Sequence, residues 1–123
     1  MSVLVTLQAL RDLYQNLHWN SKSYSDHLRY ERLYTNVAAD IDPTAELIRL
    51  RTGAFPEGAA ALRAGMISKV IEAARSNPIA LEGQLAKEIE TIKAYRPTDS
   101  GWTNHFDGLL TKSASRLYIL SFA

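Results

Sequence analysis

The chain has 123 residues, of which 46% are hydrophobic and 22% charged, so we expect residues 1–123 to form a single globular domain with its own core. Its 14 basic and 13 acidic side chains leave a formal charge of +1, which excludes the strong basic field of nonspecific nucleic-acid binders. The sequence has no cysteine, which excludes disulfides and thiolate metal sites and fits a reducing compartment.

The N-terminal stretch MSVLVTLQALRDLYQ acquires charged and polar residues too early for the apolar region of a signal peptide. No later apolar run approaches the length needed to span a membrane. We therefore expect a cytoplasmic protein.

Apolar residues near the N-terminus recur at alternating steps of four and three: Val3, Leu7, Leu10, Tyr14 and Leu17. This is the stripe of an amphipathic helix, and it predicts a first helix over about 3–20. A polar break follows, in which a serine side chain can cap the next helix. The candidates are Ser21, Ser23 and Ser25.

A second helix is predicted over about 25–51, ended by a loop with Gly53, Pro56 and Gly58. The residues expected along one side of it are His27, Tyr34, Ala38, Ile41, Ala45 and Ile48. Pro43 lies inside this helix, where it removes one backbone hydrogen bond and should kink the axis.

Residues 59–75, AAALRAGMISKVIEAAR, are typical of a short helical crossover segment. Pro78 suits the first turn of a third long helix, which ends before Pro97. Caps for a fourth helix are available at 98–100, and its apolar residues repeat with helical spacing at Phe106, Leu109, Leu110, Leu117 and Leu120. No segment alternates as a strand does, so the sequence predicts an all-α four-helix bundle with one longer connection between the second and third helices.

The second helix carries two pairs of possible metal ligands, His27 with Glu31 and Asp42 with Glu46. Residues four apart project from one face of a helix about one turn apart, and the four side chains fall within an arc of about 100°. Glu31 and Asp42, however, are separated by about 16 Å along the axis, too far to bind the same ion.

Two copies can complete a site where one cannot. If the second helices pack antiparallel across a two-fold axis, His27 and Glu31 of one subunit meet Asp42 and Glu46 of the other. This geometry predicts a homodimer with two equivalent sites, and His18, at the end of the first helix, can join His27.

Carboxylates with a few imidazoles and no sulfur suit iron, with manganese or zinc as other occupants. The alternative remains open on the pattern alone, because acidic pairs at this spacing are commonly a solvated helix face. A histidine beside a tryptophan is likewise often an ordinary half-buried residue.

Three stretches carry a resemblance to a known family: LHWN, HLRYERLY and DPTAELI. Together they resemble the Dps-type mini-ferritins of the ferritin-like superfamily, in which a His-Trp-Asn is followed by a helix that supplies a His, an acid and an Asp-x-x-Ala-Glu. RLRTGAFPEGAAALRAGMIS is similar to the family's turn and crossover helix, and DGLLTKSASRLYILSF is similar to its last helix.

The resemblance implies a ferroxidase: oxidation of ferrous iron at the two-fold interface, commonly by hydrogen peroxide, and storage of ferric iron in a shell of twelve subunits. By position, His18, His27 and Glu31 would come from one subunit, and Asp42 and Glu46 from its partner. Trp19 resembles the aromatic neighbour of that site, where it would intercept oxidising equivalents. A ring that packs in the interface is the alternative for Trp19.

Two other functions remain as alternatives. One is a ferritin-like structural or interaction module that has lost iron chemistry. The other is DNA compaction, but the chain lacks the family's lysine-rich N-terminal extension, so we expect no binding through such a tail. Scattered basic residues could form a patch in an assembly, although such charges are usually solvated: Lys22, Arg29, Arg32, Arg49 and Arg51. For His105 and Asp107 we expect a capping or surface role rather than the lining of an opening.

Overall fold

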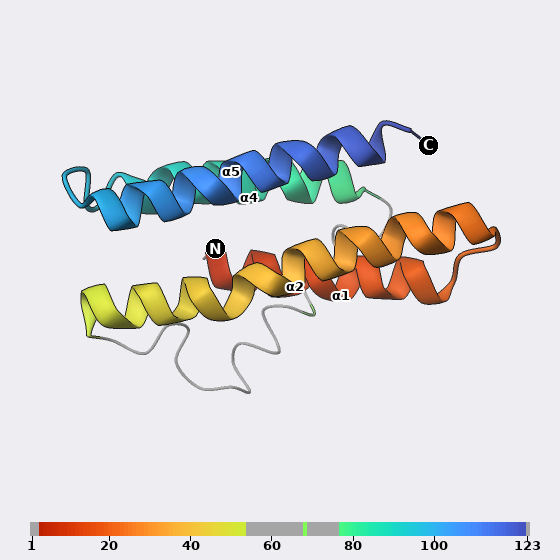
Figure 1. Ribbon diagram of the computed structural model, residues 1–123, viewed down its shortest axis with the longest axis horizontal. Helices are drawn as coiled ribbons and strands as arrows, with labels where there is room; N and C mark the ends of the chain where they lie inside the picture. Colours follow the sequence, from red (N-terminus) through yellow and green to blue (C-terminus); the bar gives the residue numbers. More distant parts are fainter. Residues whose placement is uncertain (1–2, 54–67, 69–76, 123) are drawn as a thin grey trace.

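The computed structural model describes residues 3–53, 68 and 77–122. Within these residues the chain forms four long helices and no strand: α1 (Val3–Trp19), α2 (Tyr24–Thr52), α4 (Pro78–Lys93) and α5 (Ser100–Leu120) (Figure 1). All four predicted long helices are confirmed. The expected crossover at 59–75 lies outside the described residues apart from Ser68, as do Pro56 and Gly58. None of the described helices has the length and hydropathy needed to cross a membrane.

The helix ends follow the capping chemistry of the sequence. Ser23 caps α2 by accepting a hydrogen bond from the Asp26 N–H at 3.1 Å. Gly53 ends α2 in the left-handed conformation, with φ of 71°, which residues with a Cβ rarely adopt. Asn77 caps α4, and Asp99, one of the three expected candidates, caps α5.

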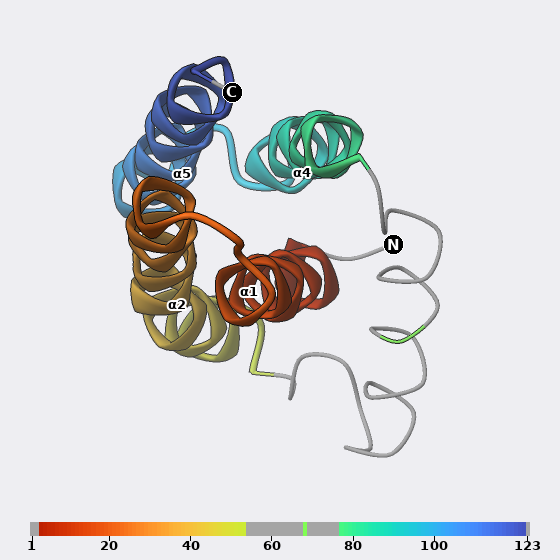
Figure 2. The same ribbon diagram turned by 90° about the vertical axis from the view of Figure 1, so that its right-hand side faces the viewer.

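The four helices occupy the corners of a bundle, in the order α1, α2, α5, α4 around its axis (Figure 2). Each helix runs antiparallel to its two neighbours, whereas α2 and α4, at opposite corners, run in the same direction (Figure 1). The end of α2 and the start of α4 therefore lie at opposite ends of the bundle.

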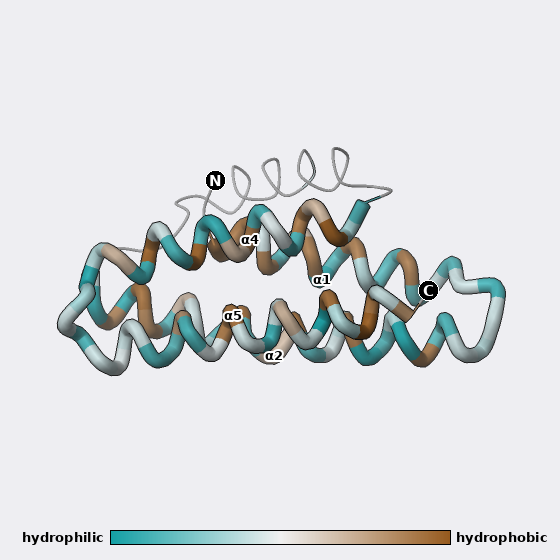
Figure 3. Tube along the Cα trace, turned by 90° about the horizontal axis from the view of Figure 1, so that it is seen from above, coloured by the Kyte–Doolittle hydropathy of each residue, from teal (hydrophilic) through white to brown (hydrophobic). Residues whose placement is uncertain are grey.

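Hydrophobic segments recur along all four helices (Figure 3) and supply the buried core. The stripe predicted for α1 is buried from Val3 to Tyr14, and Leu17 packs against it while half-buried. On α5, Phe106, Leu109 and Leu120 are buried, whereas Leu110 and Leu117 are half-buried.

The buried side of α2 differs from the predicted one. It consists of Leu33, Val37, Ile41 and Thr44. The predicted Tyr34, Ala38, Ala45 and Ile48 are half-buried, and His27 is exposed. The physical reason is that α2 packs against both α1 and α5, so its buried face is centred on the direction between these two neighbours. α2 continues through Pro43 without ending there.

Candidate metal centre

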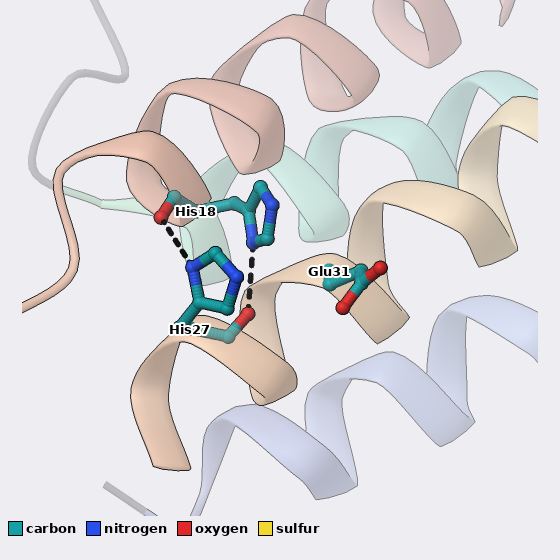
Figure 4. Close-up of side chains that lie close together, drawn as sticks. All are labelled: His18, His27 and Glu31. Atoms are coloured by element: carbon teal, nitrogen blue, oxygen red, sulfur yellow. Dashed lines mark hydrogen bonds between the residues drawn. The ribbon is translucent and has the colours of Figure 1, made fainter. Parts of the chain in front are cut away.

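The short turn between α1 and α2 brings His18 and His27 together at one end of the bundle (Figure 4). His18 lies in the last turn of α1, and His27 lies in the first turn after the Ser23 cap of α2. Because the two helices are antiparallel neighbours, their imidazole rings stack, with centroids 3.9 Å apart and planes inclined by 30°.

Two hydrogen bonds determine which nitrogen of each ring carries the proton. Nδ1 of His18 lies 2.9 Å from the carbonyl oxygen of His27, and Nδ1 of His27 lies 3.3 Å from the carbonyl oxygen of His18. A carbonyl oxygen can only accept, so each Nδ1 must donate. In the neutral rings both Nε2 atoms are then left with a free lone pair, the arrangement that backbone carbonyls commonly impose on metal-binding histidines.

Glu31 completes a cluster one helical turn beyond His27 (Figure 4). One ligand atom from each of His18, His27 and Glu31 lies within 4.8 Å of the others. Ligand atoms about 2 Å from a shared ion are about 3–4 Å apart, so a small rotation of these side chains is enough to close the cluster on a metal. His18 is half-buried and the other two are exposed, which leaves the outer side of the cluster accessible to further ligands.

Asp42 and Glu46 are also exposed, but α2 carries them away from this cluster. Asp42 follows Glu31 by about 16 Å along a continuous helix, so a single subunit does not bring the two groups together. Within residues 3–53 and 77–122, no hydrogen bond or ion pair engages the side-chain carboxylate of Glu31, Asp42 or Glu46. Three of the five predicted ligands thus meet, and the other two form a separate outward-facing pair.

The remaining predicted residues have identifiable surroundings. Trp19 is 65% exposed beside the cluster residue His18. His105 is half-buried, and its Nε2 shares a 2.8 Å hydrogen bond with the Thr44 hydroxyl, so it joins α5 to α2; burial lowers its pKa. Asp107 binds Lys93 of α4 at 2.8 Å. Both contacts link helices and neither caps one, while Asp107 is exposed, in agreement with the surface role expected as the other possibility.

Two of the basic residues considered for a surface patch are engaged in ion pairs. Arg29 pairs with Asp26 at 2.9 Å, and Arg51 at the end of α2 pairs with Asp99 at 2.7 Å. A third, Arg49, donates to the carbonyl of Gly53, which ends the same helix.

Sequence reasoning missed a charged pair inside the bundle. The Arg116 guanidinium donates to both carboxylate oxygens of Glu82 at 2.8–3.0 Å, and both side chains are almost fully buried. Burial raises the pKa of Glu82, while the hydrogen bonds and charge of Arg116 oppose that shift. Arg116 also donates to Asn36 of α2, at 2.8 Å. The signal was present in the sequence, because both charges are in phase with the apolar stripes of their helices.

No protein-family model, curated protein or solved structure matches this chain. The case for a function therefore depends on the geometry of the cluster and on the chemistry of its ligands.

Proposed function

We propose that this protein is a ferritin-like, Dps-type mini-ferritin that binds ferrous iron between two subunits, oxidises it and stores the ferric product. The observation that carries the proposal is the histidine pair, because both Nδ1 protons are held by backbone carbonyls and both Nε2 lone pairs are free. An exposed carboxylate, Glu31, lies beside these two nitrogen ligands.

The arrangement of the bundle supports this proposal. α2 and α4 run in the same direction, so the end of α2 and the start of α4 lie at opposite ends of the bundle (Figure 1). Ferritin-like bundles have their second and third long helices in this parallel arrangement, whereas simple up-and-down bundles do not.

The spacing of the ligands supports a site shared by two subunits. His27 and Glu46 are equally distant from the midpoint between residues 36 and 37 of α2, and so are Glu31 and Asp42. A two-fold axis through that midpoint, perpendicular to an antiparallel pair of α2 helices, places His27 opposite Glu46 and Glu31 opposite Asp42. Each of the two resulting sites would contain two imidazoles and three carboxylates.

In the proposed reaction, ferrous iron is the substrate and hydrogen peroxide the oxidant. Two ferrous ions each give up one electron, and the O–O bond of one peroxide breaks as it takes both. With two water molecules the products are two ferric oxyhydroxide units and four protons. The carboxylates of Glu31, Asp42 and Glu46 would favour the ferric product because they compensate its higher charge. If a peroxide meets only one ferrous ion, Trp19 would supply the second electron.

The test measures iron per subunit on a sizing column with light scattering, after anaerobic addition of Fe²⁺ and again after peroxide. We expect about one tightly bound ion or more per subunit, then ferric uptake with each peroxide addition. The double substitution Asp42→Ala/Glu46→Ala should abolish both. Glu90→Ala removes an exposed carboxylate of α4 and is the matched control.

Oxidation by the wild type at the rate of buffer alone would overturn the proposal. An oligomer that elutes without iron would instead favour the alternative of a ferritin-like structural module. Retention of DNA by the intact protein at low salt, lost at higher salt, would favour compaction.

A further inference from the structure

We propose that a divalent cation is the switch for pairing two subunits, so that the dimer forms through α2 when the ion binds and weakens when it is removed. This inference rests on the intersubunit site of the proposed function. It adds that assembly and metal binding are one linked equilibrium rather than two independent properties.

The charges along the exposed face of α2 are the first argument. The carboxylates of Glu31, Asp42 and Glu46 are exposed, and none is paired within the described part of the chain. Antiparallel pairing of α2 places all three around one site. Two like charges about 4 Å apart repel by about 1 kcal/mol even in water. Without a bound cation, this repulsion destabilises the dimer at both sites.

Three arginines of α2 have other contacts. Arg29 is paired with Asp26, and Arg49 donates to a carbonyl at the end of its own helix. Arg32 lies on the side of α2 toward α5, where it lines a groove with Ser115 and Tyr118. A bound divalent ion can therefore supply the missing positive charge.

The centre of the same face permits close approach. Around the midpoint of α2 the outer side chains are short, with Thr35 and Ala39 exposed and Ala38 half-buried. Helix axes can approach to about 8 Å where contacting side chains are small. These short side chains of α2 therefore allow the ligand pairs at either end to meet across the crossing point.

Linkage converts this geometry into a measurable effect. A single subunit offers His18, His27 and Glu31, whereas the dimer adds Asp42 and Glu46 to each ion. An ion that binds the dimer more tightly than the single subunit must strengthen dimerisation by the same factor for each of the two ions bound.

The experiment measures the dimer dissociation constant by sedimentation equilibrium, in chelator and in excess Mn²⁺, which is not oxidised under these conditions. For the wild type we expect at least about a tenfold decrease in that constant with Mn²⁺. In His27→Ala/Glu31→Ala and in Asp42→Ala/Glu46→Ala, the dimer dissociation constant should be the same in chelator and in Mn²⁺. All four residues are exposed, so both variants should fold.

Mixing the two variants gives the decisive result. In a mixed dimer, one site keeps His27 and Glu31 from one chain and Asp42 and Glu46 from the other, while the second site has lost both pairs. The mixture should recover Mn²⁺-dependent pairing with half the wild-type metal content. Failure of the mixture to pair would overturn the inference.

The outcome also separates the inference from the proposed function. A wild type that oxidises iron but has the same dimer constant in chelator and in Mn²⁺ overturns the switch and leaves the ferroxidase proposal standing. A wild type that dimerises with Mn²⁺ but does not oxidise iron overturns the ferroxidase proposal and supports the switch.

Discussion

The protons on His18 and His27 decide what the cluster can bind. Two rings stacked at 3.9 Å could form an ordinary packing contact, but each Nδ1 also donates to the carbonyl of the other residue. The His18 carbonyl, in the last turn of α1, also accepts a hydrogen bond from the Ser21 hydroxyl at 3.0 Å, so it joins the end of α1 both to the turn and to α2. One pair of hydrogen bonds thus closes the turn and orients both Nε2 atoms.

Replacement of one imidazole tests this role directly. His27→Ala should weaken Mn²⁺ binding at least about tenfold, because even the outer-shell partners of metal ligands are worth about 10–100-fold in affinity. Equilibrium dialysis against Mn²⁺ measures the change. His105→Ala is the control, since His105 is the one remaining histidine and bonds to Thr44 instead. Equal losses in the two variants would contradict a specific role for the cluster.

These side chains also mark the limit of prediction from sequence. The proximity of His18 and His27 could be predicted, because a short break joins two helices that must pack side by side. The reciprocal hydrogen bonds could not, since they depend on how far each helix is rotated about its axis. Glu82 and Arg116 were missed because charged side chains are almost never fully buried unless they are paired, and their pairing across two helices could not be predicted.

The helices themselves were predictable where capping chemistry is local. Ser23, Gly53, Pro78 and Asp99 each act within a few residues, and the helix ends agree with them. The buried face of α2 was harder to predict, because it is set by two neighbours distant in sequence.

Pro43 allows a test of how much the missing backbone hydrogen bond in α2 costs in the free energy of unfolding. Its ring removes one backbone hydrogen bond in the middle of a 29-residue helix. Pro43→Ala should therefore raise the free energy of unfolding by about 1–3 kcal/mol, measured by urea denaturation. Pro78→Ala is the matched control and should give no such gain, because proline is well accommodated in a first turn. A Pro43→Ala protein no more stable than wild type would indicate that tertiary packing already compensates for the lost bond.

Asp99 ties the start of α5 to the end of α2 and gives the fold a specific acid sensitivity. The hydrogen bond from Arg51, together with that from the Trp102 N–H, lowers the pKa of Asp99 from 3.8 to about 2. A lowered pKa in the folded state contributes stability that is present above 3.8 and is lost as the pH falls toward 2.

Asp99→Asn should remove this part of the pH dependence. The amide can still cap α5, so helix formation is retained while the charge is lost. Thermal melts between pH 5 and pH 2 should show a shallower decrease of the melting temperature in the variant than in the wild type. Parallel curves would show that Asp99 titrates with the same pKa in the folded and unfolded chains.

One polar network in the interior of the bundle joins three of its four long helices. Arg116 of α5 bonds Glu82 of α4 and Asn36 of α2, and Ser113 donates to the same carboxylate. The buried Tyr14 hydroxyl of α1 has no hydrogen-bond partner in the described part of the chain, and burial, with the charge of Glu82, raises its pKa. Hydrogen bonds therefore connect α2, α4 and α5, and α1 contributes the buried Tyr14 hydroxyl without a hydrogen bond to them.

Breaking this network on one side should be costly. Arg116→Met leaves the Glu82 carboxylate buried without its partner, so we expect a loss of about 3–5 kcal/mol in the free energy of unfolding. The double substitution Glu82→Leu/Arg116→Met removes both charges and should restore the wild-type value or exceed it by about 1–4 kcal/mol. Urea denaturation of the single and double variants measures the two changes. A double variant as unstable as the single one would mean that the polar groups fill space that apolar side chains cannot.

The same double variant separates stability from the metal centre. Asn36 lies near the midpoint between the two ligand pairs of α2, so its hydrogen bond to Arg116 could set the rotation of the helix that directs these pairs outward. Leu33, Val37 and Ile41 bury the opposite side of that helix and restrict the same rotation through packing. Because three buried side chains outweigh one half-buried amide, we expect the double variant to retain Mn²⁺ binding and Mn²⁺-dependent pairing in sedimentation equilibrium. Loss of pairing in a variant that is still fully folded would assign the orientation of α2 to the Arg116–Asn36 hydrogen bond instead.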